Sequence, residues 1–161
     1  MDFYHPILFE TIKTLNENYE LIIVDNGSDD ANTITYLKNI ECEFIKIIRE
    51  NSPFNYSTLN NTAVEIANGE YICLMNNDTE IITKNWLNEM MGHALQENVG
   101  CVGAKLLYPN NKIQHGGVIL GIGGLAGHAH WNLDRNEPGY FNRAMLAQEL
   151  SAVTAACLLV K

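Results

Sequence analysis

The chain contains LIIVDNGSDD at residues 21–30 and YICLMNNDTE at residues 71–80, two stretches in which a short apolar run leads directly into Asp and Asn residues. Apolar runs of this length that are rich in β-branched or bulky residues predict buried strands. The Asx residues that follow predict a turn where each strand ends. In an open parallel sheet, ligands bind outside the carboxyl ends of the strands, so both turns are candidate binding sites.

Helical patterns alternate with these apolar runs. The spacing of apolar residues predicts helices over residues 3–15, 56–67 and 83–95, and one more that begins after Ser28 as its N-cap and buries Ile34 and Leu37. Gly69 is expected in the C′ position of the 56–67 helix. Further strands are predicted over residues 44–48, 99–107, 113–120 and 153–160. This alternation predicts an α/β fold with a mostly parallel sheet flanked by helices.

Composition excludes several classes of protein. The 161 residues are 47% hydrophobic and 18% charged, which is typical of one globular domain. The net charge of -9 argues against a nucleic-acid partner. The longest apolar runs fall well short of the ~20 residues of a membrane span, and the first residues lack the pattern of a signal peptide, so we expect a cytoplasmic chain. The four cysteines are widely spaced, so we expect buried free thiols.

The two strand-end turns have residues suited to a nucleotide ligand. A carboxylate at a strand end can accept hydrogen bonds from a base or ribose, and a second one can hold Mg²⁺ or Mn²⁺ against a diphosphate because these ions prefer oxygen ligands. The alternative is that both segments are ordinary polar turns, since Asx residues are common in turns for local reasons.

Four segments, which together cover nearly the whole chain, point to a known family. They are LIIVDNGSDD at 21–30, NYSTLNNTAVEIANGEYICLMNNDTEI at 55–81, VGAKLLYPNNKIQHGGVILGIGGLAGHAH at 102–130 and PGYFNRAMLAQELSAVTAACLLVK at 138–161. Together they resemble the family 2 glycosyltransferases, and most of all a bacterial rhamnosyltransferase-like branch. The resemblance implies a GT-A fold, a Rossmann-like nucleotide-diphospho-sugar transferase domain, incomplete at both ends. Residues 1–98 would then be the donor-binding half and 99–161 the start of the acceptor-side half.

The resemblance also assigns roles in the first half. Asp25 is expected to bind the nucleobase of a sugar nucleotide, and Asn26 and Gly27 to shape the turn beneath it. Asn61 follows Asn60 where relatives carry Arg-Asn, and it is expected to contact the donor.

Asn76, Asn77 and Asp78 stand at the family's Asp-x-Asp position. The first acidic residue is replaced by Asn76, which could still hydrogen-bond the ribose. A Mn²⁺ or Mg²⁺ ion would therefore depend mainly on Asp78 and on phosphate oxygens of the donor.

The implied reaction is inverting transfer of a sugar from a UDP- or dTDP-linked donor to a saccharide or lipid-linked acceptor. The implied location is the cytoplasm, where the protein could also lie at the inner face of the bacterial membrane. The base of that reaction is expected beyond the last strand, with Glu149 as the nearest rival within the chain. We therefore expect the isolated chain to bind a donor without transferring sugar, and the alternative is a nucleotide-sugar binding module.

An unpaired edge beside the strand at 21–24 predicts self-association.

Other motifs are weaker. The glycine-rich stretch 121–127 partly matches a dinucleotide fingerprint, but no helix pattern follows it, so a loop at the acceptor cleft or a plain turn is favoured. His115, His128 and His130 lack further ligands at zinc spacing and are expected at the surface or in loops. Trp131 and Tyr140 lie in a polar segment where they could stack on a sugar, but the interpretation as packing residues is favoured.

Overall fold

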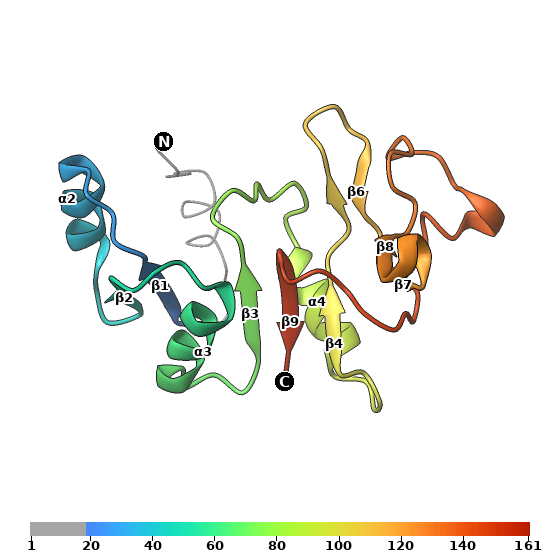
Figure 1. The fold of residues 1–161 in the computed structure, drawn as a ribbon. Helices are drawn as coiled ribbons and strands as arrows, with labels where there is room; N and C mark the ends of the chain where they lie inside the picture. Colours follow the sequence, from blue (N-terminus) through green and yellow to red (C-terminus); the bar gives the residue numbers. More distant parts are fainter. Residues whose placement is uncertain (1–18) are drawn as a thin grey trace. The chain divides into compact units, whose positions relative to one another are not determined.

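The computed structural model describes residues 19–161, which belong to two compact units (Figure 1). The first unit extends to Ile72 and the second comprises Cys73–Lys161. The helix predicted over residues 3–15 lies outside the described residues. The proposed functional halves, 1–98 and 99–161, stay a prediction.

The first unit is a strand-helix-strand-helix arrangement. Strand β1 (Leu21–Asp25) pairs in parallel with β2 (Ile45–Arg49), and helix α2 (Ala31–Ile40) connects them. Helix α3 (Tyr56–Ile66) follows and contacts β1, while α2 contacts β2. A helical crossover is the usual way to join parallel neighbours, and the buried side chains Leu37, Ile45 and Leu59 form the core of this unit.

The ends of the two helices differ from the sequence prediction. The N-cap of α2 is Asp30 rather than Ser28, and its carboxylate accepts hydrogen bonds from the Thr33 N–H at 2.7 Å and the Thr33 hydroxyl at 2.9 Å. These bonds lower the pKa of Asp30. Helix α3 ends with extended backbone at Ala67 (φ -69°, ψ 142°), and Gly69 lacks the positive φ of a C′ glycine.

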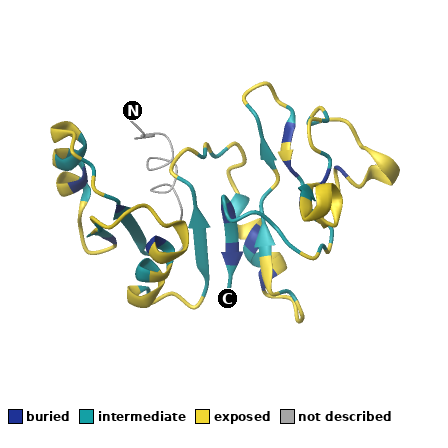
Figure 2. Cartoon of the chain, viewed as in Figure 1, coloured by how far each residue is buried: buried dark blue, intermediate teal, exposed yellow. Residues whose placement is uncertain are grey.

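The second unit contains a sheet in the order β3-β9-β4. These strands are β3 (Ile72–Met75), β9 (Cys157–Val160) and β4 (Cys101–Gly103), and β4 and β9 are antiparallel. Helix α4 (Trp86–Ala94) contacts both β4 and β9. Buried residues lie on β9 and α4, so the central strand and this helix form the core of this sheet (Figure 2).

Two short antiparallel pairs complete the second unit. Strand β5 (Leu106–Leu107) pairs with β6 (Ile113–His115), and β7 (Val118–Leu120) pairs with β8 (Ala126–His128). The predicted strand over 113–120 is thus two strands, because Gly117 has a φ of +106° that interrupts the extended backbone. The glycine-rich stretch includes the 3-10 turn η1 (Ile122–Gly124) and β8, so it forms a hairpin with β7 rather than a plain loop. A second 3-10 turn, η2, spans Tyr140–Asn142.

The α/β class is confirmed. Parallel pairing joins β1 to β2, whereas β4 with β9, β5 with β6 and β7 with β8 are antiparallel. All four cysteines are free thiols, but Cys42 and Cys101 are exposed, which corrects the expectation that they are buried. The described part of the chain has no helix that is long and apolar enough to cross a membrane.

Candidate functional site

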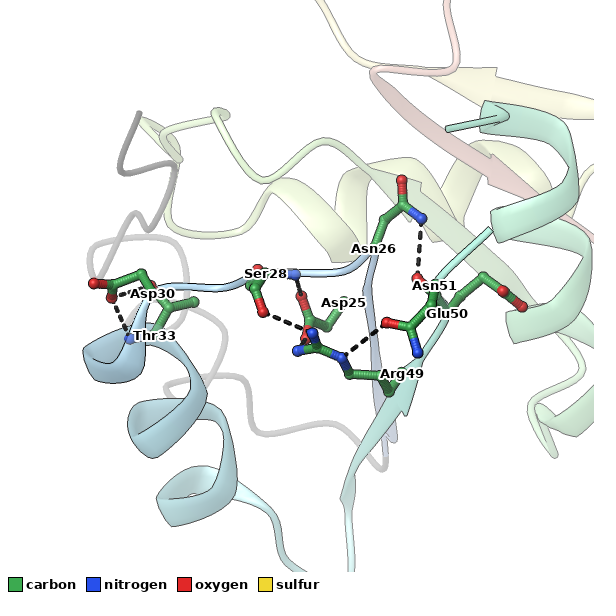
Figure 3. A network of polar contacts seen from close by, with 8 residues as sticks. All are labelled: Asp25, Asn26, Ser28, Asp30, Thr33, Arg49, Glu50 and Asn51. Carbon is green, nitrogen blue, oxygen red and sulfur yellow. Dashed lines mark hydrogen bonds and ion pairs between the residues drawn. The ribbon is translucent and has the colours of Figure 1, made fainter. Parts of the chain in front are cut away.

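A polar cluster lies where β1 and β2 end (Figure 3). Asp25 and Arg49 are register partners, so their side chains meet at the same edge of the parallel pair. Arg49 Nη1 lies 2.5 Å from Asp25 Oδ2, and the Ser28 N–H donates to Asp25 Oδ1 at 3.0 Å. The Asp25 side chain is only 4% exposed, against 42% for Arg49. The carboxylate is therefore buried and fixed, while the guanidinium stays open to solvent.

Arg49 is a residue that sequence reasoning missed. Its Nη2 donates to the Ser28 carbonyl at 2.7 Å, and its Nε donates to Asn51 Oδ1 at 3.2 Å. One guanidinium thus joins the turn after β1 to the turn after β2. The signal in the sequence was available: Arg49 ends an apolar run in the same way as Asp25, and parallel strands bring such ends to one edge.

The turn after β1 has a second anchor. Asn26 Nδ2 donates to the Glu50 carbonyl at 3.0 Å and to the Ser52 carbonyl at 2.9 Å, and the Glu50 N–H donates to the Asp25 carbonyl at 2.9 Å. Gly27 has a φ of +73°, a conformation that favours glycine. Asn26 and Gly27 therefore shape this turn.

The second predicted cluster follows β3 in the second unit. The Asn76 N–H donates to the Ala156 carbonyl at 3.0 Å, and the Thr79 N–H closes a turn on the Asn76 carbonyl at 3.3 Å. Asn76 is half-buried, whereas Asn77 and Asp78 are exposed. The turn therefore presents the Asp78 carboxylate to solvent next to a fixed strand end.

The donor set of this turn fits a divalent ion only in a limited way. Within residues 19–161, no group of three or more His, Cys, Asp or Glu side chains is arranged to hold a metal. Mg²⁺ commonly binds through one or two carboxylates and completes its shell with waters and substrate phosphates. A single exposed carboxylate such as Asp78 is compatible with that mode, and it is not compatible with a closed site made of protein ligands alone.

Asn61 lies on α3 in the first unit and is exposed. Its neighbour Asn60 uses its amide within the helix, where Nδ2 donates to the Tyr56 carbonyl at 2.8 Å. The structure thus brings Asp25, Asn26 and Gly27 together in one cluster with Arg49, and it places Asn61 on a separate helix of the same unit.

One histidine, His115, and the two aromatic residues depart from the sequence prediction. His115 is 1% exposed rather than a surface residue. Its Nδ1 lies 2.8 Å from His128 Nδ1, and its Nε2 accepts from the Thr154 N–H at 3.3 Å. Burial and the neighbouring His128 lower the pKa of His115 to about 4. Trp131 and Tyr140, interpreted as packing residues, are 61% and 75% exposed.

Comparison with known proteins identifies relatives of this chain. The family model described as glycosyl transferase family 2 matches residues 6–155. Across 151 residues, which are 92% of this chain, the chain is 49% identical to the uncharacterized protein y4gI of Sinorhizobium fredii. It is 33% identical, also over 92% of its length, to the O-antigen biosynthesis protein RfbC of Myxococcus xanthus. No solved structure matches the chain.

The chain spans only part of these relatives, 17% of the Sinorhizobium protein and 12% of the Myxococcus protein. The match to the family model nevertheless covers nearly all of the chain and includes both strand-end turns. The chain belongs to glycosyl transferase family 2, whose members have the GT-A fold.

Proposed function

We propose that this chain forms the donor-binding part of a glycosyltransferase that moves a sugar from a UDP- or dTDP-linked donor to a saccharide or lipid-linked acceptor. The observation that carries the proposal is the buried Asp25 carboxylate at the end of β1, held by Arg49 and the Ser28 N–H. Family membership supports the reaction class, and the O-antigen biosynthesis protein among the relatives supports a surface polysaccharide as product.

Asp25 is suited to recognise the nucleobase. A carboxylate offers about four lone-pair sites. Ser28 donates to one oxygen of Asp25 and Arg49 to the other, so Asp25 can still accept an N–H of a pyrimidine ring. Arg49 acts as a positioning residue that holds this carboxylate in place. Asn26 and Gly27 set the path of the backbone next to it.

Asp78 is proposed to hold Mn²⁺ or Mg²⁺, with Asn76 hydrogen-bonding the ribose and Asn77 and Asn61 as further donor contacts. When bound, the ion would neutralise the charge that develops on the departing diphosphate. The contribution of the chain is an exposed carboxylate on a turn that is fixed by the Asn76 and Thr79 backbone bonds.

We expect the chain on its own to bind donor without turnover. Asp25 is committed to Arg49 and Asp78 belongs to the donor side, so neither is available as the base that deprotonates the acceptor. Loss of a general base typically costs about 10²–10⁴-fold in rate.

We also propose a cytoplasmic location for this domain. We further propose that the isolated chain self-associates, and light scattering during size-exclusion chromatography measures its oligomeric state directly.

Isothermal titration of the chain with UDP and with dTDP tests the donor assignment. We expect measurable binding in the presence of Mn²⁺ and a change in base preference in Asp25→Asn. Asp29→Asn is the matched control, because Asp29 is an exposed carboxylate of the same turn. If neither nucleotide binds the folded chain, or if Asp25→Asn and Asp29→Asn behave alike, the assignment is wrong.

A further inference from the structure

The second unit contains a hollow that none of the roles above uses. It has a volume of about 530 Å³ and is lined by strand β7 together with Arg143, Glu149, Leu150 and Ser151. Small-molecule sites commonly measure about 300–1,000 Å³. The hollow is therefore large enough for a compact ligand such as one or two sugar rings.

One backbone hydrogen bond and one side-chain contact fix the walls of this hollow. The Val118 N–H donates to the Ala152 carbonyl at 3.1 Å, which ties β7 to the segment before β9. Leu150 sits directly on Gly117, because a Cβ at Gly117 would lie 1.9 Å from Leu150 Cδ1. The hollow is thus built into the fold of this unit.

The two charged residues of the lining are not paired with each other. Arg143 Nε donates to Gln148 Oε1 at 2.7 Å, and the Gln148 amide donates back to the Arg143 carbonyl, so the guanidinium is held in place. Within residues 19–161, the Nη atoms of Arg143 and the carboxylate of Glu149 have no protein partner, and no ion pair joins the two residues. Their hydrogen-bonding groups are available to a ligand.

The lining combines an apolar floor with both signs of charge, and this combination selects a class of ligand. Val118 and Leu150 can pack against the C–H face of a sugar ring, Glu149 can accept hydrogen bonds from hydroxyl groups, and Arg143 can donate to hydroxyl or ring oxygens. A free phosphate would meet the Glu149 carboxylate, and a purely apolar ligand would leave the hydrogen-bonding groups of both exposed residues unused.

We propose that this hollow binds the saccharide part of the acceptor, with Glu149 and Arg143 as its polar contacts. The identification of the saccharide as an acceptor rests on the proposed glycosyltransferase function. The saccharide site itself lies within the second unit and can be tested independently. In this proposal Glu149 and Arg143 bind the saccharide. Glu149 would then not be the catalytic base, the other role considered for it in the sequence analysis.

Titration of the ¹⁵N-labelled chain with a panel of methyl glycosides, followed by amide chemical shifts, tests the proposal. The panel consists of the methyl glycosides of rhamnose, mannose, glucose, galactose and N-acetylglucosamine. At least one should shift the amides of β7 and of residues 149–151. Glu149→Gln and Arg143→Gln should each weaken that binding by about 10-fold or more, as expected for a charge-assisted hydrogen bond.

Matched controls are Glu137→Gln and Lys84→Gln, which remove exposed charges elsewhere in the same unit and should leave the affinity unchanged. The proposal is overturned if no glycoside of the panel shifts these amides, or if the Glu149 and Arg143 variants bind like the controls. Nucleotide titration of the same variants separates the two proposals. Donor binding that persists without glycoside binding defeats only the saccharide site, and glycoside binding without donor binding defeats only the proposed function.

Discussion

The two units bury one polar side chain each among the described residues, and they stabilise it in opposite ways. In the first unit, Asp25 is 6% exposed and lies against the guanidinium of Arg49. In the second unit, His115 is 1% exposed, lies against another imidazole, and has a pKa lowered to about 4. The comparison shows that a buried ionisable group is tolerated either with a counter-ion or in its neutral form.

The comparison assigns different vulnerabilities to the two units. The first depends on keeping a cation next to Asp25, whereas the second depends on a pH at which His115 carries no charge. Asp78, by contrast, is exposed and needs neither device. Under the proposed function, Asp25 would therefore serve both stability and ligand binding, whereas Asp78 would serve ligand binding alone.

The largest effect is expected from Arg49→Ala. Removal of the guanidinium leaves a buried carboxylate without its cation, which should destabilise the first unit by about 3 kcal/mol. Hydrogen exchange of the β1 and β2 amides measures this loss. Arg49→Lys retains a positive charge and should lose much less, and equal protection in wild type and Arg49→Ala would show that Asp25 does not need its partner.

The second effect is a dependence of the second unit on pH. The pKa of His115 is lower in the folded chain, about 4 against an ordinary 6.5, so the unfolded chain binds the proton more tightly. Stability should therefore be full above about pH 6.5 and fall as the pH drops toward 4, by about 2.5 kcal/mol between pH 7.5 and 4.5.

Tryptophan fluorescence isolates this pH effect, because both tryptophans, Trp86 and Trp131, belong to the second unit. Urea unfolding followed by this signal should give a steep pH dependence in wild type and a flatter one in His115→Gln. A slope that is the same in both proteins would contradict the assignment of the neutral state to His115.

A smaller effect in a lower pH range is expected from Glu20 in the first unit. Lys46 Nζ donates to Glu20 at 2.8 Å, and the Asn68 backbone N–H also donates to it. These contacts lower the pKa of Glu20 to about 2, so its stabilisation is present above about pH 4.5 and is lost toward pH 2.

Because Lys46 is 37% exposed, we expect Glu20→Gln to cost about 1 kcal/mol at neutral pH. The exchange of the β1 amides should report the loss, and Glu41→Gln, which changes an exposed carboxylate of the same unit, is the control. A loss that is as large at pH 2 as at pH 7 would exclude this explanation.

The strands that carry the candidate site could be predicted from sequence, because LIIV and ICLM are apolar runs that end at Asx residues. The contacts of the site could not, because they depend on the register of β1 with β2, which brings Arg49 to Asp25. The pattern also does not reveal that α2 begins two residues after Ser28, with Asp30 as the cap that accepts from the Thr33 N–H, while Ser28 lies in the turn and donates its N–H to Asp25. The burial of His115 was missed although Ile113 and His115 alternate with Gln114, the period of a strand face.

The smallest effect on stability and the most direct test of function both concern Asp78. Because this side chain is exposed, Asp78→Asn should change the stability of the second unit by less than about 0.5 kcal/mol. The neighbouring Glu80→Gln provides the matched control, since Glu80 is an exposed carboxylate of the same segment. Any effect of Asp78→Asn on ligand binding can then be read without a correction for unfolding.

The measurement that tests the central claim is titration of UDP into wild type, Asp78→Asn and Glu80→Gln, each with and without Mn²⁺. We predict that Mn²⁺ tightens UDP binding in wild type and Glu80→Gln, and that this gain is lost in Asp78→Asn while metal-free binding stays the same. Equal gains from Mn²⁺ in all three proteins would contradict the assignment of Asp78 as the residue that holds the ion against the diphosphate.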